Sequence, residues 1–158
     1  SFLIDIPSDS NKNWLIGPLM GFPLAVLPPN ENGYRPVLSL TPESKPTKKE
    51  IDFDLVEQSN GFYKNGRTNY VKNRKGIIKK FFEPTKTKNK AKLNLYTFGY
   101  EYTIDDLHVI EKSVRFVCDG YMVYAMARYY PEYHKTAKQD FDKIFDNLQC
   151  KKNSGSRS

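Results

Sequence analysis

The sequence predicts an α+β domain, in which an antiparallel β-sheet of about six strands is flanked by two helices. Three observations carry this prediction. Strand-like segments fall into two groups, an amphipathic segment follows each group, and an Asp119-Gly120 pair joins two segments rich in β-branched and aromatic residues. The chain has 158 residues, enough for one core. We therefore expect a single domain over residues 1–150 and a disordered polar tail over 151–158.

The first group of strands lies before residue 43. Residues 2–7 alternate apolar and polar side chains and end at Pro7, as a half-buried edge strand does. Residues 23–28 form a short apolar run closed by prolines. Residues 35–42 form the next strand, with Pro36 near its start because proline has no N–H to donate.

The first helix is predicted after Thr47-Lys-Lys-Glu50, which has the spacing of a capping box. Ile51, Leu55 and Phe62 then share one face of the helix. We expect Asn60-Gly61 or Asn65-Gly66 to end or interrupt it, since glycine lowers helix stability.

The second group of strands begins at Gly76. Residues 76–84 and 92–102 read as strands separated by a basic turn over 85–90, and Gly99 indicates a bulge or close packing. Asp105-Asp106 marks a further turn. Residues 108–118 and 121–130 form a hairpin, because Asp119-Gly120 suits the two positive-φ positions of a type I′ turn.

The second helix follows a second capping-box spacing, Thr136-Ala-Lys-Gln139. Phe141, Ile144, Phe145 and Leu148 recur at helical spacing, so this segment predicts an amphipathic helix with its apolar stripe on the sheet.

Cys118 and Cys150 are the only two cysteines. One lies at the predicted hairpin turn and the other after the last helix, which favours a disulfide that fastens this helix to the sheet and implies an oxidising compartment. Two free thiols, or a nucleophilic thiol, are the alternatives. A nucleophile would need a neighbouring base, and no motif supplies one.

The net charge of +7 is concentrated in residues 64–92, which hold eleven basic residues and a single acidic one. Such a segment predicts contact with an anionic partner: a lipid headgroup, a wall polymer or an acidic protein. The alternative is a cytoplasmic protein that binds nucleic acid through the same basic segment, with exposed tyrosines as a stacking platform. A solvated lysine-rich surface without a partner is the third reading. The candidate contact residues are Lys72, Arg74, Lys75, Lys79, Lys80, Lys86, Lys88 and Lys90.

The sequence carries no motif of a known chemistry. It has no phosphate-binding loop and no nucleophile elbow, and His108 and His134 lack the spacing of zinc ligands. We therefore predict neither catalysis nor a cofactor or metal. No apolar run of about 18 residues is present, so no transmembrane segment is predicted.

The order of elements resembles the PsbP-like sandwich, a family that also contains DcrB-type envelope lipoproteins of bacteria. The resemblance rests on the opening strand over residues 2–7 followed by Trp14, the strand over 37–40, and the terminal hairpin leading into the amphipathic helix over 141–148. It implies a non-enzymatic binding or accessory domain outside the cytoplasm, either periplasmic or extracellular. With no initiator Met at Ser1, we expect that a leader has been removed.

Overall fold

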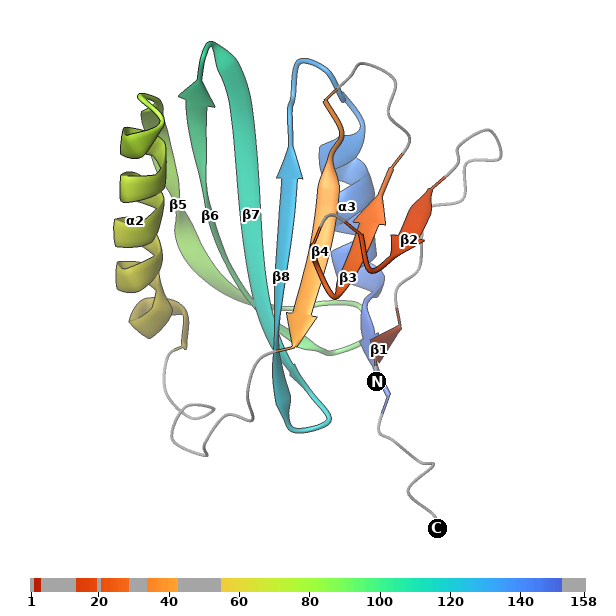
Figure 1. Ribbon diagram of the computed structural model, residues 1–158. Coiled ribbons are helices and arrows are strands. Elements are labelled where there is room, and N and C mark those ends of the chain that lie inside the picture. The colour runs from red at the N-terminus through yellow and green to blue at the C-terminus, as the bar shows by residue number, and fades with distance from the viewer. Residues whose placement is uncertain (1, 4–13, 20, 29–33, 43–54, 152–158) are drawn as a thin grey trace.

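The computed structural model describes residues 2–3, 14–19, 21–28, 34–42 and 55–151. Figure 1 shows a central sheet with a helix on either side of it. The elements in chain order are β1 (Phe2–Leu3), β2 (Leu15–Gly17), β3 (Leu24–Leu27), β4 (Val37–Pro42), α2 (Leu55–Asn73), β5 (Ile77–Lys88), β6 (Asn94–Ile104), β7 (Leu107–Cys118), β8 (Tyr121–Tyr129), α3 (Ala137–Asn147) and β9 (Gln149–Cys150).

The main sheet has seven strands in the order β2-β3-β4-β8-β7-β6-β5, and every neighbouring pair is antiparallel. The α+β class is confirmed, but the prediction of about six strands is low by one. The extra strand is β2, which pairs with β3 over Leu15–Gly17. The predicted edge strand over residues 2–7 is described only at Phe2–Leu3, which pairs with β9 in a separate two-stranded sheet.

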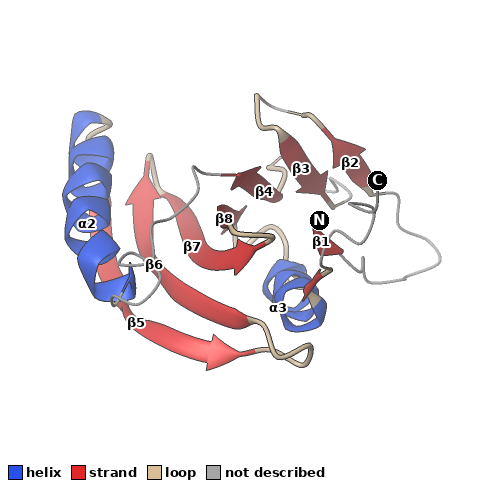
Figure 2. Cartoon of the chain, turned by 90° about the horizontal axis from the view of Figure 1, so that it is seen from below, coloured by secondary structure: helices blue, strands red, loops and turns tan. Residues whose placement is uncertain are grey.

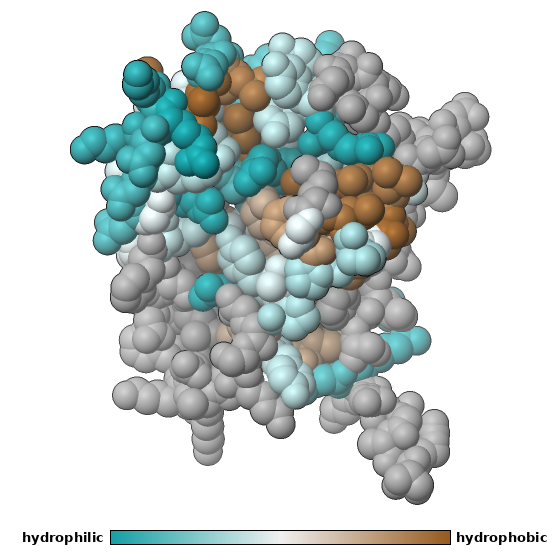
Figure 3. Space-filling model, viewed as in Figure 1, coloured by the Kyte–Doolittle hydropathy of each residue, from teal (hydrophilic) through white to brown (hydrophobic). Residues whose placement is uncertain are grey.

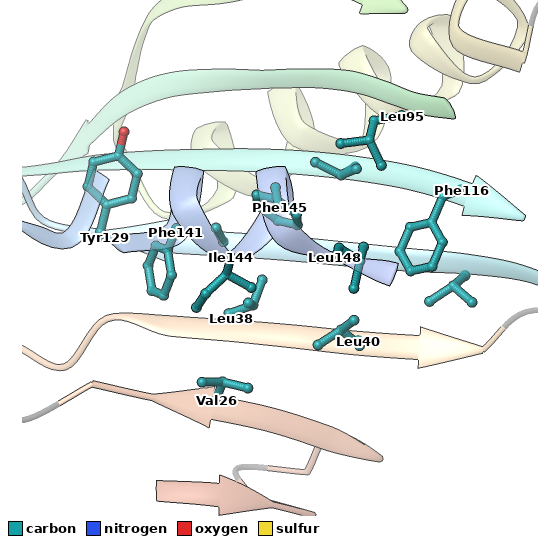
Figure 4. Close-up of a cluster of buried hydrophobic side chains, with 14 of the residues drawn as sticks. Val26, Leu38, Leu40, Leu95, Phe116, Tyr129, Phe141, Ile144, Phe145 and Leu148 are labelled. Atoms are coloured by element: carbon teal, nitrogen blue, oxygen red, sulfur yellow. The ribbon is translucent and has the colours of Figure 1, made fainter. Parts of the chain in front are cut away.

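The larger part of the core lies between α3 and one face of the sheet (Figure 4). The four apolar residues predicted for this helix, of which Leu148 lies just beyond the end of α3, are at most 3% exposed, and they pack against side chains of β4, β7 and β8. Each such side chain contributes about 1.5–3 kcal/mol by leaving water. The predicted capping box is not formed, because the Thr136 side chain makes no capping hydrogen bond.

Helix α2 covers the opposite face of the sheet, over β5 and β6 (Figure 2). It continues through both Asn-Gly pairs, so the expectation that one of them would end or interrupt it was wrong. The cost of the exposed Gly61 and Gly66 is offset by tertiary packing, since Tyr63 meets the rings of Phe98 and Tyr100 edge-on. The predicted capping box at residues 47–50 and Ile51 lie outside the described residues.

Helix α2 ends in a Schellman motif. The Gly76 N–H donates to the Val71 carbonyl and the Lys75 N–H to the Lys72 carbonyl, while Lys75 takes the left-handed position with φ 57°. A Cβ on Gly76 would lie 2.5 Å from the Thr103 carbonyl oxygen, so glycine is required here for close packing. The motif turns the chain directly into β5.

Strand β5 is longer than predicted. The segment expected to be a basic turn, residues 85–90, instead continues the strand to Lys88, and irregularities in register lie between Ile78 and Lys80 and between Phe82 and Thr85. The second one accommodates Pro84, which lacks an N–H for the ladder. On β6, Gly99 serves close packing, because a Cβ there would lie 2.3 Å from the Glu111 carbonyl oxygen.

The β6–β7 and β7–β8 hairpins turn on residues with positive φ. Asp119 and Gly120 have φ of 52° and 76°, as a type I′ turn requires, and Asp105 and Asp106 have φ of 51° and 63°. These two tight turns place β6, β7 and β8 side by side in a continuous meander.

Asn89 joins the turn after β5 to the end of α3. Its Nδ2 donates to the carbonyl oxygens of Phe145 (2.9 Å) and Leu148 (2.8 Å), while its Oδ1 accepts from the N–H groups of Ala91 (3.1 Å) and Leu93 (2.9 Å). One buried amide therefore closes the β5–β6 turn and satisfies carbonyls at the C-terminal end of a helix.

Candidate functional site

The predicted basic residues gather at one side of the molecule, around the end of α2 and along β5. Figure 3 shows hydrophilic residues concentrated on the side where α2 lies. We call this surface the basic edge and define it as the eight candidate contact residues without Lys90. All seven side chains are exposed: Lys72, Arg74, Lys75, Lys79, Lys80, Lys86 and Lys88.

Lys90 does not belong with the others. Its Nζ lies 3.3 Å from a carboxylate oxygen of Asp146 on α3, so its charge is neutralised locally. Arg74 is partly held as well, because its guanidinium lies 3.8 Å from the Tyr70 ring centroid and donates to the Tyr70 carbonyl. In the described part of the chain, no carboxylate forms an ion pair with Lys72, Lys75, Lys79, Lys80 or Lys88.

The lysines of β5 point to both faces of the sheet. Lys80 pairs in register with Glu101, whereas Lys86 pairs with Tyr96 and Lys88 with Asn94. Side chains paired across two strands lie on the same face, so Lys86 and Lys88 lie on the α2 side and Lys80 lies on the α3 side. The basic edge is therefore a ridge along the rim of the sheet.

A groove of about 380 Å³ lies between α3 and the β5–β6 hairpin. Leu95, Val114 and Phe145 give it an apolar lining, and Thr87 and Thr97 add hydroxyl groups. Its charged wall is formed by Lys88, Lys112, Asp142, Lys143 and Asp146.

This wall is centred on Asp142. One carboxylate oxygen lies 3.0 Å from Lys112 Nζ, and the other lies 2.8 Å from Lys138 Nζ. Partial burial alone would raise the pKa of Asp142, but the bonds with the two ammonium groups outweigh it and lower that pKa.

A buried carboxylate lies under α2, and sequence reasoning missed it. Glu111 on β7 is 1% exposed, and its Oε1 lies 3.4 Å from Nη2 of Arg128 and 3.9 Å from Nη1 of Arg67. Burial alone would lower the pKa of both arginines, but the attraction of Glu111 raises it. Burial, and then Glu111, also raise the pKa of Tyr100. The only signal in the sequence is that Arg128 lies in a strand, where arginines usually pair with acids.

His108 also lies between carboxylates. Its Nδ1 is 2.7 Å from Glu132 and its Nε2 is 2.7 Å from Glu101. The hydrogen bond with His108 lowers the pKa of Glu132. Both ring nitrogens are engaged, so neither is available in this arrangement to activate a nucleophile or to bind a metal.

Cys118 and Cys150 form the predicted disulfide, with Cα atoms 5.5 Å apart. Their sulfur atoms and the Asp119 carboxylate lie within 4.8 Å of one another, the one such group of possible metal ligands in the described segments. Because both sulfurs are consumed in the disulfide, a single carboxylate remains, which is too little to hold an ion.

Several of the tyrosines that the nucleic-acid interpretation would use as a stacking platform are buried. Tyr100, Tyr102 and Tyr129 are between 0% and 6% exposed and belong to the core. Tyr34, Tyr121 and Tyr133 are exposed, and the ring centroids of Tyr34 and Tyr133 lie 4.7 Å apart. No described helix is long and apolar enough to cross a bilayer.

Comparison with known proteins gives a likeness of fold. No protein-family profile matches the sequence, and no curated protein matches it. The solved structures that are similar over most of the chain include the following two. The first is LpqN of Mycobacterium tuberculosis, described as involved in cell envelope biogenesis, with TM-score 0.53, 12% identity and coverage of 94% of this chain and 83% of LpqN.

The second is the cyanobacterial PsbP (CyanoP) of Synechocystis sp. PCC 6803, with TM-score 0.54, 11% identity and coverage of 96% of this chain and 92% of CyanoP. The chain therefore has the PsbP-like fold expected from its order of elements. At these identities the likeness extends to the fold alone.

Proposed function

We propose that this chain is a non-catalytic binding or accessory domain that works outside the cytoplasm and contacts an anionic partner through the basic edge. The observation that carries the proposal is the run of exposed lysines at the rim of the sheet, most of them without a carboxylate partner in the described residues. Unpaired surface cations attract anionic partners and raise their rate of association.

Export is supported by the Cys118–Cys150 disulfide, because such bonds persist in oxidising compartments and are rare in the cytosol. The fold of LpqN, a protein described as involved in cell envelope biogenesis, agrees with that location. The test is intact mass with thiol alkylation of protein purified natively from its own cells. A closed disulfide is expected, and two freely labelled thiols would contradict export.

The absence of catalysis is supported by the way in which the titratable groups of the described residues satisfy one another. Glu111, His108 and Asp142 are each held by side chains of opposite or complementary character. Each of the three side chains therefore already has a partner, whereas an acid or base for catalysis must reach the proton that it transfers to or from the substrate.

The contact surface is tested by charge reversal. The variant Lys79→Glu, Lys80→Glu, Lys86→Glu and Lys88→Glu should lose binding to vesicles of phosphatidylglycerol and to polyglutamate by about tenfold or more, and wild-type binding should weaken as salt rises. The control is a variant with Lys135→Glu and Lys138→Glu, which reverses exposed lysines before and on α3 that do not line the groove beside Lys88. Equal affinity of the wild type and the fourfold variant would refute the basic edge.

Nucleic acid is the weaker candidate. Its electrostatic part would use the same lysines, but the core tyrosines cannot stack on bases. Affinity that depends on base sequence or on strandedness, rather than on charge alone, would favour nucleic acid over the proposal.

A further inference from the structure

We propose that the occupant of the basic edge is an extended acidic polypeptide segment, which adds to β5 as an eighth strand of the sheet. The inference rests on the proposed function and specifies the partner. It starts from the topology of the described residues, among which β5 is the last strand of the sheet and pairs with β6 on one side only.

Strand β5 offers an unusually long rim. It has 12 residues, against a typical strand of about 5–6 residues. At about 3.3 Å per residue it extends for roughly 40 Å. The strand at the other rim, β2, has three residues. A sheet edge presents a row of backbone N–H and C=O groups that can pair with another chain.

The regular part of this rim is the segment Thr85–Lys88. Here four consecutive residues pair in unbroken register with β6, after the second irregularity has ended. All four side chains are exposed. The threonines favour extended pairing, and an unbroken register gives an added strand a straight template.

The charges of Thr85–Lys88 determine which sequence of the added strand is complementary to β5. Lys86 and Lys88 lie on one face, and Thr85 and Thr87 on the other. A strand laid beside β5 places every second side chain next to the two ammonium groups, so a segment with Glu or Asp at alternate positions is complementary. A second copy of β5 would instead bring lysine against lysine, which disfavours self-pairing.

A bilayer surface fits this arrangement less well. Lys80 lies on the opposite face of the sheet from Lys86 and Lys88, so the ammonium groups form a ridge and cannot all meet one plane of headgroups. A strand lying along the rim can reach both faces, because its own side chains alternate.

The test uses a capped synthetic peptide of alternating glutamate and threonine, with two derivatives that carry N-methyl groups on all glutamate amides or on all threonine amides. Methylation leaves the charge unchanged but removes the backbone donors along one edge of the peptide. One of the two edges must face β5, so we expect at least one derivative to bind about tenfold or more weakly than the parent. The amides of Thr85–Lys88 should also exchange more slowly when the parent peptide is bound.

The matched variants are Lys86→Glu with Lys88→Glu, and Lys135→Glu with Lys138→Glu as a control of equal charge, since neither control residue lines the groove beside Thr87 and Lys88. The first pair should weaken binding of the parent peptide about tenfold or more, and the control pair should bind as the wild type does. If both methylated peptides bind as tightly as the parent while charge reversal still weakens binding, strand addition is refuted and the proposed function stands. Binding to phosphatidylglycerol vesicles without binding to the peptide has the same meaning. If neither methylation nor any reversal of the basic edge changes affinity, both proposals fail.

Discussion

Replacing Asn89 by alanine should destabilise the protein far more than its position in a surface turn suggests. The amide makes four hydrogen bonds, and net contributions of about 0.5–1.5 kcal/mol each set an upper range of roughly 2–6 kcal/mol. Two of the four groups that lose a hydrogen bond in this variant can still bond to another partner. The Phe145 carbonyl keeps the Leu148 N–H at 3.4 Å, and Ala91 is exposed, so water can reach it. We therefore expect a loss of about 2–4 kcal/mol.

The measurement is the free energy of unfolding in urea, with the disulfide intact in both proteins. The slope of the transition should not change, because Asn89→Ala alters contacts of the native state. Asn94→Ala is the control, since this exposed asparagine begins β6, and its effect should stay within about 0.5 kcal/mol. Asn89→Asp should cost at least as much as alanine at neutral pH, because a carboxylate would face the carbonyls at a helix C-terminus. A loss below about 0.5 kcal/mol for Asn89→Ala would refute the role assigned to this amide.

Three further predictions concern stability. Cys118→Ser with Cys150→Ser removes a disulfide that spans 32 residues and should lower the free energy of unfolding by about 3–4 kcal/mol. An unchanged urea midpoint would contradict a stabilising role of this disulfide. Gly99→Ala should cost about 1–3 kcal/mol because its Cβ meets backbone, whereas Gly66→Ala meets nothing within 4 Å and should stabilise α2 by up to about 1 kcal/mol; equal effects in urea would contradict the packing argument. Burial, and then Asp142 and Glu101, raise the pKa of Tyr129 from 10.0 to about 12. The unfolded chain therefore ionises first, and stability that is intact below pH 10.0 should fall between pH 10.0 and about 12; urea titrations across this window that show no fall would be the contrary result.

The parts of the fold that were predictable depend on local chemistry. The Asp119-Gly120 turn follows from the backbone angles its residues allow, and the apolar stripe of α3 follows from spacing alone. Helix α2 was harder, because its glycines argue against a continuous helix, and only packing of Tyr63 on β6 outweighs them. Strand β5 was cut short at Pro84 because a proline normally ends a ladder, while here the change in register absorbs it.

The sequence predicted which basic residues form the candidate site, but not how their side chains are arranged on the two faces of the sheet. Exposure of the lysines follows from their charge. The irregularities in the register of β5 decide whether the side chains of Lys80 and Lys86 lie on the same face of the sheet. No pattern in the sequence predicts where these irregularities fall. Glu111 was missed because its partners, Arg67 and Arg128, come from a helix and a strand that only the folded chain brings together.

The pairing of β4 with β8 has a consequence for how the chain reaches this state. Val37 lies opposite Arg128, so the junction joins segments separated by most of the sequence, whereas β6, β7 and β8 are joined by tight turns. Local hairpins close before contacts of long range, because closing a longer loop costs more entropy. A folding intermediate with the meander formed and β4 undocked would expose the rim of β8, a strand of nine mostly apolar and aromatic residues. Such a rim pairs readily with other chains, so we expect refolding to compete with aggregation at the step in which β4 docks on β8.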